Sequence, residues 1–309
     1  MASCPGASPD FVSWVSEQTD LVQTDTEFGG LGWNVKPRLL LRAIESTSSA
    51  VLWLDADVIV TGDIEAVMPS DLSVVVAAEE FALAQEQGSE ARTAAWSLEP
   101  GRRLSSTANT SVLRVSDHHL GLLERWAELL ERPDYRASQQ LPALERPLHM
   151  LGDQDALTAL LGTRDYGVVP VHLLRRGQEI AQCGSPAGYL PSERLLGLRR
   201  PLPVFVHSAG VKPWQHGARW RHSGSRVAQL RAGYEDAHIR LSPYTILARE
   251  LSESAGLDAN VFGAPTVVER ILLTSGRRWP QLPELPLAVF DSLVRRVRAR
   301  LALGRYRLG

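Results

Sequence analysis

Cysteine, lysine and long apolar runs are scarce in this chain of 309 residues. Its two cysteines, Cys4 and Cys183, are too few for a disulfide framework or a cysteine-rich metal site, which favours a reducing compartment. No run of about 18 apolar residues occurs, so a membrane-spanning helix is excluded. Residues 1–10 lack the basic and apolar regions of a signal peptide, and we therefore expect a cytoplasmic protein.

Positive charge is not in excess, and lysine supplies little of it. The net charge is −2, whereas a protein that grips nucleic acid over a broad surface is usually more basic, so nucleic acid is not an expected partner. Of 33 Lys and Arg residues, only Lys36 and Lys212 are lysine. In a chain so biased toward arginine, these two indicate a need for a compact point charge.

Apolar runs alternate with amphipathic segments over the first two thirds of the chain. Strands are expected at residues 51–54, 58–60, 72–78, 111–115, 168–171 and 203–206, and helices at 36–45, 120–130 and 152–161. Residues 79–104 read as irregular and charged. Strands that alternate with helices predict an α/β fold with a mostly parallel sheet.

Strand signals fade after about residue 225, and helices are expected at 225–235, 244–254 and 266–274. We therefore predict a domain over residues 1–224 and a helical C-terminal extension over 225–309. Residues 287–309 carry six arginines against Asp291, and their apolar residues share one helical face. Two interpretations stay open for this tail: it lies on an anionic membrane surface, at the inner face, or it packs against its own domain.

A pair of carboxylates, Asp55 and Asp57, directly follows the predicted strand 51–54. Open α/β sheets bind ligands at the carboxyl ends of their strands, and paired hard oxygens suit Mg²⁺ or Mn²⁺, which can bridge a diphosphate. Solvated turn aspartates are the plainer alternative. Such a pair also serves phosphatases of the haloacid-dehalogenase type and GT-A glycosyltransferases. In the phosphatase pattern the lysine precedes the later acidic ligands along the chain. Here Lys212 follows the acidic residues at 152–155, so this order of residues disfavours the phosphatase.

Four segments follow one another in the order typical of a known enzyme family. They are Lys36 and Arg38 on a helix that leads into Leu54-Asp55-Ala56-Asp57, then Asn109-Thr110-Ser111-Val112-Leu113, then Gly152-Asp153-Gln154-Asp155-Ala156-Leu157, and finally His207-Ser208-Ala209-Gly210-Val211-Lys212-Pro213-Trp214. On these motifs, residues 30–215 resemble the retaining glycosyltransferase family 8, which contains glycogenin and bacterial lipopolysaccharide galactosyltransferases.

The resemblance implies a GT-A fold and a metal-dependent hexosyltransferase. Its donor would be a nucleoside-diphosphate sugar, a UDP-sugar first of all, and its acceptor an unknown molecule such as a bacterial cell-envelope glycan or glycolipid. The family pattern implies three sets of residues: Asp55, Asp57 and His207 as ligands of Mn²⁺ or Mg²⁺; Lys36, Arg38, Asn109, Asp155, Gly210 and Lys212 as donor contacts; and Asp153 and Gln154 as catalytic residues.

The chain departs from the family pattern in three places. Only 54 residues precede Asp55, and residues 1–10 do not resemble the family's nucleotide-binding first strand, so either the start is truncated or uridine is bound differently. Gly210 and Lys212 are one residue closer than usual, and Ser111 replaces a glycine. A second hypothesis therefore stays open: a non-catalytic binding protein that kept the fold and lost the nucleotide pocket.

Overall fold

The computed structural model describes residues 2–3, 8–19, 22–23, 32–47, 49–80, 88–184, 188–210, 212–215, 225–257, 262, 267–276 and 278–306. The chain divides into two compact units. Unit 1 comprises Met1–Trp53, Pro69–Ala78 and Leu83–Leu173, and unit 2 comprises Leu54–Met68, Glu79–Ala82 and Leu174–Gly309. Residues 225–309 therefore group with residues 174–224, so the predicted boundary at 224/225 does not coincide with the division between the units.

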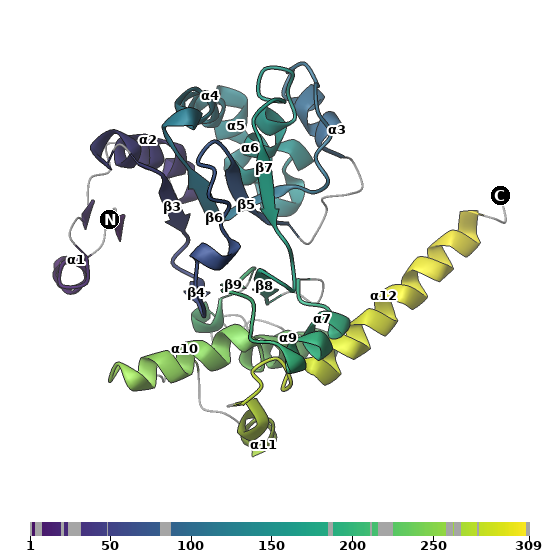
Figure 1. Cartoon of the computed structure of the whole chain (residues 1–309). Coiled ribbons are helices and arrows are strands. Elements are labelled where there is room, and N and C mark those ends of the chain that lie inside the picture. The colour runs from purple at the N-terminus through teal and green to yellow at the C-terminus, as the bar shows by residue number, and fades with distance from the viewer. Residues whose placement is uncertain are drawn as a thin grey trace. The chain divides into compact units, whose positions relative to one another are not determined.

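A four-stranded sheet with helices beside it forms the centre of unit 1 (Figure 1). Its strands lie in the order β3 (Val51–Leu54), β6 (Ala108–Val115), β5 (Val75–Glu79) and β7 (Val171–Leu174). The helices of this unit are α1 (Pro9–Ser16), α2 (Lys36–Thr47), α3 (Gly88–Ala95), α4 (Leu120–Glu131), α5 (Pro133–Gln139) and α6 (Asp153–Leu161). Every residue of β6 is buried, as expected of a strand paired on both sides.

Helix packing in unit 1 follows from the sequence. Along α2, Leu39, Leu40 and Ala43 are buried at helical spacing, and Pro37 stands in the first turn, where its missing N–H costs no hydrogen bond. The indole of Trp126 on α4 is fully buried and donates its Nε1 hydrogen to the carbonyl of Asp153 at 2.9 Å, which satisfies its only polar atom. These contacts join α2, α4 and α6 to one core.

Unit 2 is built on a three-stranded sheet in the order β4 (Val58–Val60), β9 (Phe205–Ser208) and β8 (Ile180–Cys183). β4 pairs antiparallel with β9, and β8 pairs parallel with it. The helices of this unit are α7 (Pro191–Leu196), α9 (Arg226–Arg240), α10 (Pro243–Ser254), α11 (Val267–Gly276) and α12 (Leu285–Tyr306), of which α10 contacts β4 and β9 (Figure 1).

Side-chain caps and a buried ionic network hold the helices of unit 2. Ser225 caps α9 by accepting the amide hydrogen of Ala228 at 3.2 Å, and Ser242 caps α10 in the same way. Arg194 on α7 forms an ion pair of 2.7 Å with Glu284, which also lies 2.9 Å from the Nδ1 atom of His238 on α9. The first turns of α12 are thus fixed to α7 and α9 by buried charges.

Most predicted elements are confirmed: helices form at α2, α4, α6, α9, α10, α11 and α12, and strands at β3, β4 and β6. The structure is a mixed α/β fold with parallel strand pairs. β5, β7 and β9 are shifted by two or three residues from the predicted ranges. Short 3₁₀ turns lie at Gly32–Val35, Glu65–Val67, Asp117–His119, Ala143–Glu145, Leu148–Met150, Gly197–Arg199 and Pro213–Gln215. No helix in the described ranges is both long and apolar enough to cross a bilayer.

One prediction about local structure is wrong, and several short elements were not predicted from the sequence. Residues 79–104 are not wholly irregular, because α3 forms there with polar residues, Arg92 and Thr93, on its buried side, so hydrophobic periodicity does not reveal it. β8 was not predicted from the sequence because the buried Gln182 interrupts its apolar run. Within residues 1–10, a two-residue strand, β1 (Ala2–Ser3), pairs parallel with β2 (Val22–Gln23).

Candidate metal centre and buried polar clusters

Asp55 and Asp57 belong to unit 2 and flank the turn that leads into β4. The turn is closed by a hydrogen bond of 3.0 Å from the amide of Val58 to the carbonyl of Asp55. The carbonyl of Asp57 accepts the amide hydrogen of Ser208 at 3.0 Å, which ties the turn to the end of β9. Asp57 is buried and Asp55 is half-buried.

The strand register brings His207 to this turn. His207 lies on β9 opposite Val58, the residue after Asp57. Its Nε2 atom is 3.6 Å from Oδ2 of Asp57, and its Nδ1 atom is buried without a hydrogen-bond partner among the described residues. Asp55, Asp57 and His207 each offer a ligand atom, and these atoms all lie within 4.8 Å of one another. The sequence-predicted metal ligands are therefore brought together.

Lys212 adds a positive charge to the same turn. Its Nζ atom contacts Oδ2 of Asp57 and donates to the carbonyl of Ser208 at 2.6 Å. Between them, Gly210 adopts a φ of +91°, in the left-handed region that favours glycine, and so turns the chain after β9. Lys212 is thus placed beside the carboxylate of Asp57, whereas the predicted contacts of Gly210 and Lys212 with a donor stay predictions.

The electrostatics of the turn favour an ionised carboxylate. Burial raises the pKa of Asp57, but His207 and Lys212 outweigh this effect by hydrogen bonding and by charge, so that its pKa falls to about 2. At neutral pH Asp57 is therefore an anion, with the ammonium group of Lys212 beside it.

The three side chains fit a divalent cation. Two carboxylate oxygens and one imidazole nitrogen form a mixed donor set that Mn²⁺ accepts more readily than Mg²⁺. Three protein ligands also leave coordination positions for oxygens of a bound diphosphate.

A second polar cluster lies in unit 1 and joins three elements. Nζ of Lys36 on α2 donates to Oγ1 of Thr110 on β6 at 3.0 Å, and that hydroxyl donates to Oδ2 of Asp153 on α6 at 2.8 Å. Lys36 and Asp153 are themselves 3.6 Å apart, and both are buried. Lys36 also faces the ring of Trp53 at 5.9 Å. A buried lysine that holds a buried carboxylate fixes the orientation of Asp153.

Other predicted site residues have partners of their own. Asp155 is buried in an ion pair of 3.2 Å with Arg92 and also accepts the amide hydrogen of Gly152, so it fixes the start of α6. Arg38 pairs with Glu131 at 3.1 Å near the surface instead of joining Asp153. Asn109 is buried on β6, and its Oδ1 accepts the amide hydrogen of Ser111 at 2.9 Å.

Gln154 follows Asp153 in the first turn of α6 and is half-buried. Two further residues of these clusters were not singled out from the sequence. Thr110 stands inside the motif that begins at Asn109, so the motif itself was a usable signal. Arg92 lies in the segment read as irregular, and no local pattern pointed to it.

Comparison with known proteins gives little further information. No family model matches the chain, and no curated protein matches its sequence. Among solved structures, the chain is similar to the crystal structure of a glycosyltransferase involved in the glycosylation of the major capsid of PBCV-1. The two share 13% identity with a TM-score of 0.38, over 68% of this chain and 92% of that chain. At that similarity the match assigns no activity to the chain.

Proposed function

We propose that this chain is a metal-dependent glycosyltransferase of the GT-A type, related to family 8, which transfers a hexose from a UDP-sugar with retention. One observation carries the proposal: Asp55, Asp57 and His207 converge within 4.8 Å, with Lys212 beside them. The same residues form the first and fourth motifs of the sequence resemblance, although they lie far apart along the chain.

The residues of the turn have separate roles in this proposal. Asp55, Asp57 and His207 would hold Mn²⁺ or Mg²⁺, and the bound ion would supply positive charge to the diphosphate leaving group. Lys212 moves from Asp57 to a phosphate oxygen and carries part of the same negative charge. Gly210 has no side chain, so the backbone can approach the diphosphate closely.

Residues of unit 1 are proposed to act on the sugar. Asp153, held by Lys36 and Thr110, accepts hydrogen bonds from donor hydroxyls, and Asn109 assists. Gln154 lies next to Asp153 at the start of α6, and an amide is a poor nucleophile, which favours substitution at one face through an oxocarbenium-like ion pair. Arg38 and Asp155 were candidate donor contacts, but their ion pairs favour roles in holding α2 and α6.

The acceptor is proposed to be a cell-envelope glycan or glycolipid reached at the cytoplasmic face of a membrane. Phe290, Leu293 and Val297 on α12 are each more than half exposed and follow helical spacing, with the exposed Arg296 beside them. Phe290→Ser combined with Leu293→Ser should weaken flotation with vesicles that contain an anionic lipid. Flotation that is unchanged in this variant removes the contact between α12 and the membrane from the proposal.

Calorimetric titration of UDP into the whole chain tests the donor site, with and without Mn²⁺. Binding is expected only with Mn²⁺, and Asp57→Ala should abolish it. Asp63→Ala is the matched control, because Asp63 is an exposed acid of the same unit outside the metal cluster. Hydrolysis of UDP-sugars by the same preparations, with the anomer of the product read by NMR, then identifies the sugar and the stereochemistry.

Absence of UDP binding in every condition would contradict the enzyme proposal and favour the non-catalytic binding protein. Binding that is equally weakened by Asp63→Ala would show that the loss does not arise from the metal cluster. Binding without Mn²⁺ that survives Asp57→Ala would place the nucleotide away from these carboxylates.

A further inference from the structure

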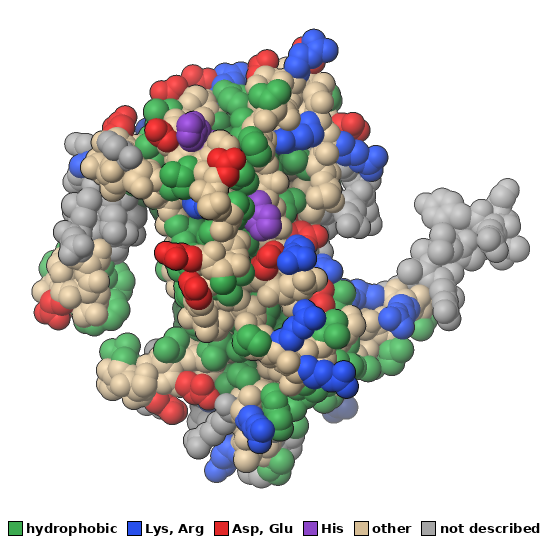
Figure 2. Space-filling view, in the orientation of Figure 1, with side chains coloured by type: hydrophobic (Ala, Val, Ile, Leu, Met, Phe, Trp, Pro, Cys, Tyr) green, Lys and Arg blue, Asp and Glu red, His purple; other side chains and the backbone are tan. Residues whose placement is uncertain are grey.

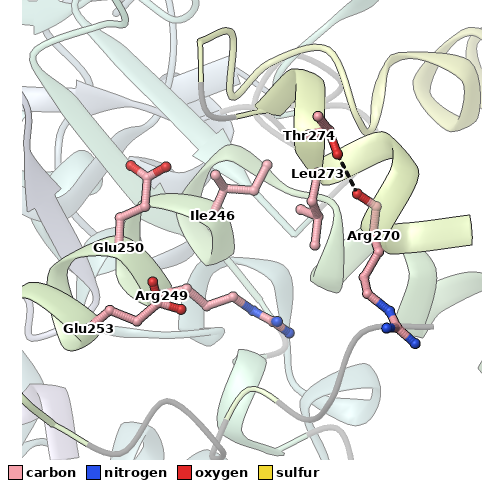
Figure 3. A pocket seen from close by; sticks show the side chains of 7 residues that line it. All are labelled: Ile246, Arg249, Glu250, Glu253, Arg270, Leu273 and Thr274. Carbon is pink, nitrogen blue, oxygen red and sulfur yellow. Dashed lines mark hydrogen bonds between the residues drawn. The ribbon is translucent and has the colours of Figure 1, made fainter. Parts of the chain in front are cut away.

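Two pockets lined by described residues of unit 2 differ in their charge. The pocket between α10 and α11 has a volume of about 420 Å³. Glu250 and Glu253 stand on one side of it and Arg270 on the other, with Arg249 between them (Figure 3). Two carboxylates and two guanidinium groups balance, so this pocket selects no class of ligand.

The second pocket has a volume of about 530 Å³ and a surplus of positive charge. It is lined by the loop after α7, by the residues that precede α12, and by Thr61 at the end of β4. Arg199, Arg200 and Arg278 contribute to the lining, and none of the described lining residues is acidic. In Figure 2, Lys and Arg side chains gather over the part of unit 2 that holds α7 and the start of α12.

These three guanidinium groups differ from the other arginines around them. Arg194, on the neighbouring helix, is buried against Glu284, whereas Arg199, Arg200 and Arg278 are exposed and have no carboxylate partner in the described part of the chain. Arg278 lies over the ring of Trp279 at 4.6 Å, which holds its guanidinium plane in place. Three unneutralised guanidinium groups around one pocket, one of them oriented by an aromatic ring, attract an anion with several acceptor oxygens.

Buried and apolar side chains complete the lining. Gln281 is only 3% exposed, and its Nε2 atom donates to the carbonyl of Gly197 at 2.9 Å, which fixes this side chain below the pocket surface. Leu202 and the face of Trp279 add apolar surface to the lining.

We propose that this pocket binds a phosphate ester. The phosphate contacts the guanidinium groups of Arg199, Arg200 and Arg278. The pocket is separate from the metal cluster, because β4 lies between Asp57 and Thr61, and four residues of extended chain span about 13 Å. The ligand is therefore a second anion, distinct from the diphosphate of the proposed donor.

Glycerol phosphate is the probe, either free or as the headgroup of phosphatidylglycerol, because it presents the phosphate ester both in solution and on a membrane surface. Calorimetry with free glycerol phosphate and co-sedimentation with phosphatidylglycerol vesicles are carried out on the whole chain, with a chelator present to exclude metal-bound phosphate. Binding of either probe is expected. Arg199→Gln combined with Arg200→Gln should weaken it by at least about tenfold, since two charge-assisted contacts are lost.

Two variants serve as controls. Arg226→Gln removes an exposed arginine of the same unit outside the pocket, and Lys212→Gln removes the cation of the metal cluster. Both should bind the probe as the unaltered chain does. A preference for vesicles identifies a lipid headgroup as the source, and equal affinity for the free ester identifies a soluble one; both outcomes support the pocket. The proposal is overturned if neither probe binds, if Arg226→Gln weakens binding equally, or if Lys212→Gln abolishes it.

Discussion

Replacement of Lys212 by glutamine should tighten the binding of Mn²⁺ to the nucleotide-free chain. In this structure Nζ of Lys212 contacts the same carboxylate oxygen of Asp57 that faces His207. The lysine therefore acts as an internal cation at the cluster, and a metal ion that arrives without a nucleotide must displace it or bind beside its charge.

The size of this effect follows from the charges at the turn. The pKa of Asp57 falls from 3.8 to about 2, which corresponds to about 2 kcal/mol of net stabilisation of the carboxylate by its neighbours. Coulomb repulsion between a divalent ion and a lysine about 5 Å away amounts to about 1–2 kcal/mol even at the dielectric constant of water. Removal of Lys212 should thus tighten Mn²⁺ binding by about tenfold.

Calorimetric titration of Mn²⁺ at neutral pH, without nucleotide, measures the change directly. Lys212→Arg is the control, since it keeps the positive charge, and it should bind Mn²⁺ as the unaltered chain does. With Mn²⁺ saturating, the order should reverse for UDP, which Lys212→Gln should bind more weakly because a phosphate contact is lost. Unchanged or weaker Mn²⁺ binding by Lys212→Gln in the absence of nucleotide would refute the reasoning.

Two further predictions concern buried ion pairs. Glu284→Gln should lower the free energy of unfolding by about 3 kcal/mol in urea titrations, because it leaves the guanidinium of Arg194 buried without a counterion, and a loss under about 1 kcal/mol would contradict this. Burial raises the pKa of Glu284, but Arg194 and His238 hold this pKa below its ordinary value of 4.5. The free energy of unfolding, measured against pH, should therefore keep this contribution above pH 4.5 and lose it as the pH falls below that value. Glu284→Gln should reduce the dependence of the free energy of unfolding on pH in this range. In unit 1, Arg92→Met should cost about 3–5 kcal/mol by stranding Asp155, and Arg92→Met combined with Asp155→Leu should recover part of that loss in the same titrations.

Local pattern was sufficient to predict most elements. α2 and α4 each present apolar residues at a period of 3.6, and such a stripe indicates a helix without knowledge of what covers it. The apolar run at Val51–Leu54 likewise predicts β3. The same reasoning failed for α3, whose buried Arg92 and Thr93 are polar and are satisfied by partners far along the chain.

The spacing of residues along the chain identified the ligands of the candidate metal centre but could not show that they converge. The D-x-D pattern identified Asp55 and Asp57, and the resemblance of the fourth motif identified His207 and Lys212. Their convergence depends on the pairing of β4 with β9 in one register, which places His207 opposite Val58. A shift by one residue would turn the imidazole to the other face of the sheet, so the long-range register decides whether the cluster exists.

By itself, the sequence determined the α/β class, most helices and strands, and the residue types able to hold a cation and a diphosphate. Only the tertiary structure decided the partners of each charge: Lys212 on Asp57, Lys36 beside Asp153, and Arg92 on Asp155. It also decided which arginines near α7 have no carboxylate partner among the described residues. The physical reason is that hydrophobic periodicity is a local property, whereas a buried charge is stable only where a distant segment supplies its counterion.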